Sequence, residues 1–211
     1  MLFLVNLVEP KIFFSRYKRL FQEKLDQERE KNITHLLEFI RTDPAITDIR
    51  WAAYMLATTK HETAHTWAPI VERGSIAYFT KRYWSNERVR VRLGNLAIGD
   101  AARYRGRGYV QITGRRNYAV MGGYVGTDIL SAPHLALDPT IAYRIMSIGM
   151  RYGYFTGKHL RSYLNEKERD YVNARRIING LDRAKEIATY ATLLEKIITP
   201  SSTFPIPIRN G

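Results

Sequence analysis

The sequence predicts a mainly α-helical protein with little β-structure, folded as a single domain. Its 211 residues are enough to bury one sizeable core, and its hydrophobic (45%) and charged (25%) fractions are those of an ordinary globular chain. Over most of the chain, apolar residues recur every three or four positions, which is the spacing of amphipathic helices. There is no cysteine, so stability must come from packing and not from disulfides.

Six helices are expected from this spacing and from capping residues. They cover residues 11–26, 33–40, 48–62, 139–152, 166–178 and 182–198. A polar run at 26–32 separates the first two helices. Thr47 or Asp48 can cap the third, Pro139 suits the first turn of the fourth, and Asn179-Gly180 closes the fifth.

The remaining segments are expected to be extended or irregular. Arg88–Leu93 alternates arginine with aliphatic residues and Tyr109–Ile112 is mostly apolar, so both predict short extended segments. The glycine-rich stretch 94–108 predicts a loop. We expect Met1–Val8 to form a first strand or a packed arm, and Thr199–Gly211 to form an extended tail.

The chain is strongly basic, with 33 lysines and arginines against 20 acidic residues and a net charge of +13. Such a charge attracts polyanions, and salt weakens the attraction. Nucleic acid, anionic lipid or lipopolysaccharide, and bacterial wall polymers all qualify as partners. Charge alone does not choose among them, and solubility is a sufficient explanation by itself.

The stretch Thr58–Gly74 contains the most informative pair of residues, Glu62 and Glu72. Isolated glutamates are usually ordinary surface charges, and a straight helix would hold two of them, ten residues apart, at about 15 Å. A turn at Trp67-Ala68-Pro69 separates this pair, however, and could fold one carboxyl back toward the other. Inverting glycoside hydrolysis uses two carboxyl groups roughly 6.5–9.5 Å apart. The stretch therefore predicts a catalytic carboxylate pair.

The same stretch allows a second interpretation, because His61-Glu62-Thr63-Ala64-His65 is a literal H-E-x-x-H. Two histidines spaced i, i+4 on one helix can bind zinc while the glutamate activates a water. A catalytic zinc needs a third ligand, and the extended form of the motif requires glycine at position 68 and histidine at 71, where the chain has Ala68 and Val71. A zinc metallohydrolase remains an alternative.

Three separated blocks then resemble one enzyme family. They are K-H-E-T at 60–63, V-E-R-G at 71–74 and Y-R-G-R-G-Y-V-Q-I-T-G-R-R-N-Y at 104–118, with a weaker fourth block, R-I-I-N-G, at 176–180. Together they resemble glycoside hydrolase family 19, the chitinases and the related lysozyme-like endolysins of bacteria and phages. The resemblance implies a lysozyme-like, two-lobed helical domain with a central cleft. A single domain would span 1–211, with an N-terminal helical region (1–45), a catalytic core (46–198) and a tail (199–211).

The resemblance also implies site residues. Glu62 matches the general acid, Glu72 the general base, and Thr113 the hydroxyl that helps to hold the attacking water. Gln111, Asn117, Asn179 and Tyr104 match substrate-binding positions. We expect an apolar helix surface to keep Glu62 protonated and Arg73 to keep Glu72 charged. No metal or other cofactor is expected.

The predicted activity is endo-hydrolysis of β-1,4 linkages in polymers of N-acetylated sugars. The short segment between the glutamates, the absence of cysteines and a threonine at 113 resemble the compact bacterial or phage branch of the family. The absence of cysteines and of a signal peptide, the small size and the strong positive charge favour peptidoglycan as substrate, with chitin as the alternative. A basic nucleic-acid-binding module would explain only the charge. We expect no nucleic-acid partner, electrostatic association with the anionic bacterial envelope, no stable membrane insertion, and a monomer.

The N-terminus bears on localisation. Met1–Val8 is apolar apart from Asn6, but it has no basic leader, and no small-residue cleavage site follows it. We therefore expect synthesis in the cytoplasm without a Sec signal, followed by action on the cell wall or in the periplasm after release.

Overall fold

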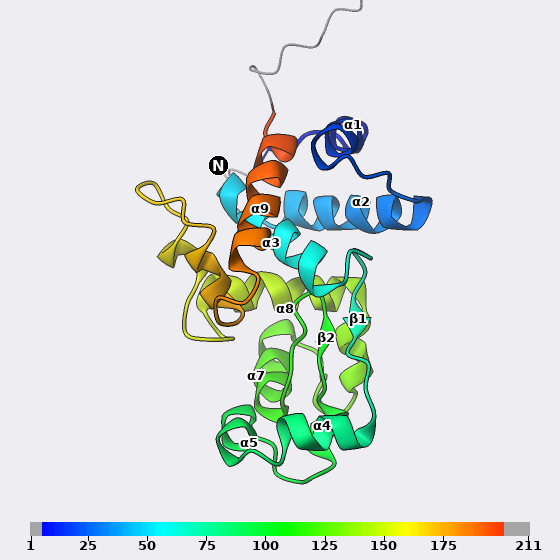
Figure 1. Ribbon diagram of the computed structural model, residues 1–211, viewed down its shortest axis with the longest axis vertical. Coiled ribbons are helices and arrows are strands. Elements are labelled where there is room, and N and C mark those ends of the chain that lie inside the picture. The colour runs from blue at the N-terminus through cyan, green and yellow to red at the C-terminus, as the bar shows by residue number, and fades with distance from the viewer. Residues whose placement is uncertain (1–5, 201–211) are drawn as a thin grey trace, which may run out of the picture.

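The computed structural model describes residues 6–200, and its fold is mainly helical and arranged in two lobes (Figure 1). The first lobe contains α1 (Pro10–Phe21), α2 (Gln27–Thr42), α3 (Ile49–Glu62) and α9 (Ala184–Ile198). The second contains β1 (Ile70–Val71), α4 (Ile76–Tyr83), α5 (Glu87–Leu93), α6 (Asp100–Arg103), β2 (Arg107–Gly108) and α7 (Arg115–Val125). The long helix α8 (Pro139–Tyr152) crosses between the lobes. Short 3-10 helices complete the fold at η1 (Pro133–Leu137), η2 (Leu160–Ser162) and η3 (Asn173–Ile177). The mainly α, two-lobed fold class is confirmed.

Helix α3 is the centre of the first lobe. The Asp48 side chain caps it by accepting a hydrogen bond from the backbone N–H of Arg50. Every residue from Trp51 to Lys60 is buried, and the helix packs along α9. A helix that is enclosed on all sides over ten residues lies at the centre of its lobe. The two residues that follow Lys60, His61 and Glu62, are partly exposed at its C-terminal end.

Helix α8 is tied to the first lobe by one carboxylate. Asp43, which follows α2, accepts hydrogen bonds from the hydroxyls of Tyr143 (3.0 Å) and Ser147 (2.6 Å), both on α8. The helix itself begins as expected, with Asp138 as its cap and Pro139 in its first turn. Because α8 also packs against α7 and η1, it is shared by both lobes.

The sheet holds the beginning of the second lobe in place. β1 pairs antiparallel with β2, with Ile70 opposite Gly108 and Val71 opposite Arg107. The backbone N–H of Glu72 then donates to Gly106 O at 2.8 Å. Glu72 is thereby fixed immediately after the sheet.

Two segments that were expected to be extended are not. Arg88–Leu93 lies in α5, because the Asn86 side chain caps the helix and Leu93 turns into the core. Tyr109–Ile112 forms a tight turn in which Gln111 has a left-handed backbone (φ 54°). On a strand Gln111 and Thr113, two positions apart, would point to the same side, but no strand is formed here.

Other boundaries also differ from expectation. The predicted helix 166–178 is wrong: a turn closed by a Leu164–Arg169 bridge precedes the short η3. The polar run 26–32 belongs mostly to α2, capped by Asp26, and α7 was not expected.

The N-terminal segment forms a packed arm. Leu7 and Val8 are buried, and Val8 N donates to Ile198 O. The predictions for residues 1–5 and 201–211 lie outside the described residues. No helix within 6–200 is long and apolar enough to cross a membrane.

The turn after Glu62 is conformationally strained. Ala64 (φ 48°), His65 (φ 65°) and Trp67 (φ 61°) all have left-handed backbones, which are unfavourable for residues with a Cβ. The turn is held by Thr63, whose hydroxyl donates to Thr59 O and accepts from Trp67 N, and by the fully buried Trp67 ring. This turn redirects the chain from α3 into β1.

We predict that Ala64→Gly leaves the free energy of unfolding unchanged or raises it by up to about 1 kcal/mol, because glycine adopts a left-handed backbone without strain. Ala119→Gly is the matched control, since Ala119 is also exposed but lies inside α7, where glycine should cost about 1 kcal/mol. Urea unfolding of both variants measures the difference. A loss at Ala64 as large as the loss at Ala119 would contradict the strain argument.

Candidate active site

Glu62 is the last residue of α3, and its carboxylate is paired with a buried arginine. Glu62 Oε1 accepts a hydrogen bond from Arg175 Nη1 at 2.5 Å. Arg175 belongs to η3, is 2% exposed, and is held from its other side by donating from Nε to Asp182 O. Glu62 Oε2 has no partner among the described residues. The expectation that Glu62 lies in apolar surroundings is thus wrong, because the Arg175 guanidinium faces its carboxylate.

Glu72 follows β1 and is surrounded by hydrogen-bond donors. Tyr83 Oη lies 2.9 and 2.8 Å from its two carboxylate oxygens, Gly106 N lies 3.1 Å from Oε2, and Tyr78 Oη lies 3.3 Å from Oε1. Burial and the hydrogen bond to Glu72 both raise the pKa of Tyr83, so its hydroxyl stays protonated. Glu72 is arranged to accept hydrogen bonds, as an ionised carboxylate does.

The cation nearest to Glu72 is also not the expected one. Arg82 Nε, on α4, lies 3.8 Å from Glu72 Oε1, whereas the neighbouring Arg73 is exposed. Because Arg82 is itself more than half exposed, water screens much of this attraction. The direct hydrogen bonds, and not an ion pair with Arg73, hold Glu72 in place.

Gly106 is required because Glu72 and Gln111 both press against its backbone. A Cβ at this position would lie 2.8 Å from Gln111 Oε1 and 3.3 Å from both Cβ and Oε2 of Glu72. Gln111 in turn donates from Nε2 to the carbonyl oxygens of Ile70 and Gly108, each at 3.0 Å. Gln111 therefore ties β1 to the glycine-rich turn beside Glu72.

Thr113 and Asn117 continue the same network. Thr113 Oγ1 donates to Gln111 O at 2.9 Å, and Asn117 Nδ2 donates to Thr113 O at 2.7 Å. Since the Thr113 hydroxyl uses its proton on the backbone, its lone pairs remain able to accept a hydrogen bond. The structure thus joins Glu72, Gln111, Thr113 and Asn117 through Gly106 and the backbone, and all four side chains are half-buried.

Two predicted substrate-binding residues are not in this network. Tyr104 is 2% exposed, packs against Tyr118 and donates from its hydroxyl to Leu130 O, so it is a core residue of the second lobe and not a sugar contact. Asn179 is exposed and its side chain accepts from Gly180 N. It lies two residues beyond the end of η3 and four residues after Arg175, and its role in binding stays a prediction.

The zinc interpretation depended on a helix that continues through both histidines. Helix α3 ends at Glu62, and His65 lies in the strained turn with its ring edge-on to Tyr190. His61 and His65 are therefore not one turn apart on a helix. Within residues 6–200, no three or more histidine, cysteine, aspartate or glutamate side chains are grouped so as to hold a metal ion.

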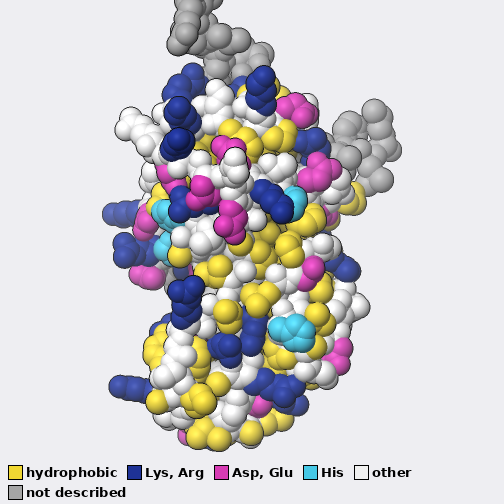
Figure 2. Space-filling view, turned by 90° about the vertical axis from the view of Figure 1, so that its right-hand side faces the viewer, with side chains coloured by type: hydrophobic (Ala, Val, Ile, Leu, Met, Phe, Trp, Pro, Cys, Tyr) yellow, Lys and Arg dark blue, Asp and Glu magenta, His cyan; other side chains and the backbone are white. Residues whose placement is uncertain are grey.

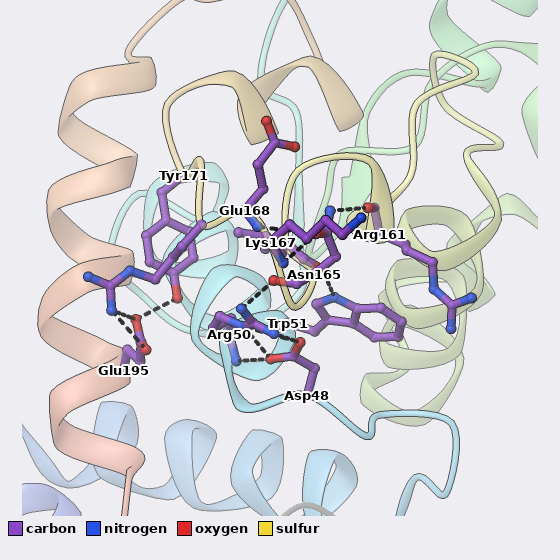
Figure 3. Close-up of polar contacts among 11 residues, drawn as sticks. Asp48, Arg50, Trp51, Arg161, Asn165, Lys167, Glu168, Tyr171 and Glu195 are labelled. Atoms are coloured by element: carbon purple, nitrogen blue, oxygen red, sulfur yellow. Dashed lines mark hydrogen bonds and ion pairs between the residues drawn. The ribbon is translucent and has the colours of Figure 1, made fainter.

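A pocket of about 1000 Å³ lies at the N-terminal end of α3, opposite to the end that carries Glu62. Figure 3 shows the polar contacts of residues around it. Arg50 binds Asp48 and Asn165 O there, while Trp51 Nε1 donates to Leu164 O. These side chains already have partners that close the 159–171 loop onto α3. Neither Glu62 and Glu72 nor the other residues matched by the family resemblance line this pocket.

Comparison with known proteins decides the family. The glycoside hydrolase family 19 model, described as chitinase class I, matches residues 36–150, which is more than half of the chain. The chain belongs to glycoside hydrolase family 19. No curated protein matches the sequence.

Two solved structures share the family 19 fold. Chitinase C from Streptomyces griseus HUT6037 is 19% identical, with a TM-score of 0.57 over 87% of this chain and 75% of that chain. A mutant of chitinase C is 18% identical, with a TM-score of 0.55 over 87% and 90% of the two chains. At these identities the likeness concerns the fold. Family membership itself makes the protein a glycosidase.

Sequence reasoning missed several partners of the two glutamates in this family 19 chain. Arg175 was placed in a helix and given no role, and its contact with Glu62 spans 113 residues of sequence. The aromatic residues of segment 76–84 fit either a sugar-stacking wall or a packed core by their sequence, but the hydroxyls of Tyr78 and Tyr83 bind Glu72 instead. The signal in the sequence that could have revealed these contacts is the presence of Tyr78 and Tyr83 just after V-E-R-G, on the helix that becomes α4.

A buried ammonium anchors the end of α3 to the rest of the first lobe. Lys60 is 1% exposed, and its Nζ donates to Tyr17 Oη and Glu23 Oε2, each at 2.7 Å. The ammonium also lies 5.0–5.7 Å from the ring centroids of four aromatic residues: Tyr17, Phe21, Trp67 and Tyr190. This cage fixes α1 and the strained turn around the residue two positions before Glu62.

The Lys60–Glu23 pair should make stability depend on pH. Burial acts to raise the pKa of Glu23, but hydrogen bonds from Lys60 and Tyr17 outweigh it and lower the pKa below its ordinary value of 4.5. A carboxyl whose folded pKa is lowered stabilises the protein above its unfolded pKa. That contribution disappears as the pH falls through the folded pKa.

We predict that Glu23→Gln lowers the free energy of unfolding at pH 7 by about 2–3 kcal/mol, less than the 3–5 kcal/mol of a fully enclosed pair because Glu23 is partly exposed. The deficit relative to wild type should shrink in urea unfolding at pH 3. Glu28→Gln, at an exposed position in the first turn of α2 with no ion-pair or hydrogen-bond partner within residues 6–200, should lower the free energy of unfolding by no more than about 1 kcal/mol at pH 7. A deficit that is equal at pH 7 and pH 3 would refute the assignment.

Proposed function

We propose that this family 19 chain hydrolyses β-1,4 linkages within polymers of N-acetylated sugars, with inversion at the anomeric carbon. The observation that supports this most is the contrast between the two glutamates. Glu72 accepts hydrogen bonds at both oxygens, whereas Glu62 has one oxygen fixed by Arg175 and the other without a partner among the described residues. Two carboxyl groups in different surroundings are suited to different roles.

Glu72 is proposed as the general base. Its carboxylate removes a proton from a water while the water oxygen attacks the anomeric carbon. Thr113 Oγ1, whose own proton is donated to Gln111 O, accepts the second O–H of that water. Tyr83 and Gly106 N keep the carboxylate in a fixed orientation, so little reorganisation is needed when the water arrives.

Glu62 is proposed as the general acid. The proton is carried on Oε2 and passes to the glycosidic oxygen as the bond from the anomeric carbon to that oxygen breaks. Loss of the proton leaves a carboxylate that already faces the Arg175 guanidinium. Arg175 therefore stabilises the negative charge that develops on Glu62 in the transition state, in addition to fixing the direction of Oε2.

We predict that Glu62→Gln and Glu72→Gln each lower kcat by about 10²-fold or more, because the leaving group or the water then lacks its proton-transfer partner. Thr113→Ala should cost less, since the water keeps Glu72. Glu28→Gln is the control and should retain the wild-type rate. NMR of the first-formed product should show an inverted anomeric centre before mutarotation.

Three outcomes would contradict this mechanism. A retained product would mean that the second carboxylate acts as a nucleophile. A Glu72→Gln variant with undiminished rate would mean that V-E-R-G does not supply the base. Loss of turnover on chelation, with recovery on added zinc, would instead favour the metallohydrolase interpretation of His61 and His65.

Two polymers contain the proposed linkage. Chitin is supported by the description of the family model and by the chitinases that share the fold. This support is at least as strong as the support for peptidoglycan. Peptidoglycan is supported by the +13 charge, which would draw the protein to the anionic bacterial envelope. We propose the linkage they share as the target, reached after release from the cell that makes the protein.

We predict that the protein releases reducing ends from chitin oligomers at a rate insensitive to salt, because that substrate is neutral. Turnover of purified peptidoglycan should fall between low and high salt, because attraction to a polyanion is screened. Turnover of only one polymer would assign the substrate. Hydrolysis of peptidoglycan that is equally fast at both salt concentrations would remove the electrostatic argument.

A further inference from the structure

The end of the second lobe farthest from α3 exposes aliphatic side chains. Val91 is 59% exposed, Leu96 76% and Ile98 58%, and they lie within eight residues of one another. Figure 2 shows hydrophobic side chains gathered at the lower end of the molecule with basic side chains beside them. Exposed apolar groups that lie together, unlike single ones, indicate an interaction surface.

The loop that carries Leu96 and Ile98 is held in place by its own polar residues. Asn95 donates to Tyr83 O and accepts from Arg115 N, and Asp100 Oδ2 accepts from Leu96 N at 2.8 Å and from Ala97 N at 3.2 Å. The backbone is therefore anchored while the two aliphatic side chains remain outside. Their exposure is a consequence of an ordered loop.

The same surface is basic. Leu93 faces the core from α5, which leaves Arg88, Val91 and Arg92 on the exposed face, where residues three and four positions apart are neighbours. Segment 81–98 contains five basic residues and one acidic residue, Glu87, which lies 3.8 Å from Arg90. Arg88 and Arg92 have no ion-pair partner within the described part of the chain. We call Arg88, Val91, Arg92, Leu96 and Ile98 the cationic tip.

We propose that the cationic tip binds the surface of an anionic phospholipid bilayer. The guanidinium groups of Arg88 and Arg92 would contact lipid phosphates while Leu96 and Ile98 enter the boundary between headgroups and acyl chains. Binding is peripheral, since no helix within 6–200 could span the bilayer. It does not require that the glycosidase function proposed above be correct.

The chemistry of the tip favours lipid over other anionic partners. Nucleic acids and sugars are bound by aromatic rings that stack on their flat faces, whereas the exposed apolar groups of the tip are aliphatic. A soluble polyanion would use the arginines and leave Leu96 and Ile98 in water. The surface of an anionic bilayer offers both anionic groups and an apolar layer, and it therefore accounts for both halves of the tip.

The test is co-sedimentation with vesicles of phosphatidylethanolamine and phosphatidylglycerol, compared with vesicles of phosphatidylcholine. Wild type should bind the anionic vesicles in a salt-dependent manner and should not bind phosphatidylcholine. Arg88→Gln/Arg92→Gln should weaken binding about 25-fold, at roughly fivefold per charge. Leu96→Ser/Ile98→Ser should weaken it about tenfold with no change of charge.

Lys11→Gln/Lys18→Gln is the matched control, because it removes the same charge from exposed positions on α1 in the other lobe. It should bind within about twofold of wild type. An equal loss in this control, or undiminished binding by Leu96→Ser/Ile98→Ser, would show general attraction to charge and overturn the proposal, as would absence of binding to anionic vesicles. Turnover of chitin oligomers and thermal unfolding should be unchanged in all three variants.

Discussion

The enclosure of α3 is the constraint on which the rest of the structure depends. Because Trp51 to Lys60 are buried without interruption, the helix has no freedom to rotate or slide, and Glu62 leaves the core in one fixed direction. Lys60, two residues earlier, is held by Glu23, Tyr17 and four aromatic rings. The candidate acid is thus positioned by the hydrophobic core itself, which gives it the rigidity that proton transfer to a specific atom requires.

The two glutamates of this family 19 chain are supported in different ways. Glu62 depends on a long-range ion pair with Arg175, a residue that follows it by 113 positions. Glu72 depends on local groups, namely the sheet, Gly106 and two tyrosines of the helix that follows. The two carboxyl groups thus differ in their partners although their residue type is the same, since Glu62 pairs with a buried guanidinium while Glu72 accepts mainly from neutral donors and has the exposed Arg82 3.8 Å away.

The sequence predicts those features that depend on neighbouring residues. The start of α3 at Asp48, its end near Glu62 and the first turn of α8 at Pro139 follow from caps and apolar spacing, and the structure confirms them. The alternation of Arg88–Leu93 fits both a strand and two turns of helix. The helix forms because the Asn86 side chain caps it. Short segments of this kind are ambiguous by periodicity alone.

Features that depend on the folded chain could not be obtained in this way. The resemblance placed Tyr104 and Thr113 in one block but could not tell which side chains of that block face inward, and Tyr104 lies in the core. The left-handed backbone of Gln111 gives no signal in the sequence, because it is imposed by contacts with Ile70 and Gly108. Arg175 is one of two adjacent arginines, and only the packing of η3 buries one of them.

The path of the chain has a mechanical consequence for catalysis. It passes from the first lobe to the second once, through the turn at 63–69, and returns once, where η1 leads into α8 at Asp138. The first crossing is stiffened by Thr63 and the buried Trp67, and the second by the cap that Asp138 provides and by Pro139. The first crossing lies between Glu62 and Glu72, so it fixes how the end of α3 and the end of β1 lie relative to one another. Under the proposed mechanism the distance between the two carboxyl groups separates inversion from retention, so a change in the length of the 63–69 connector is expected to affect the outcome without touching either glutamate.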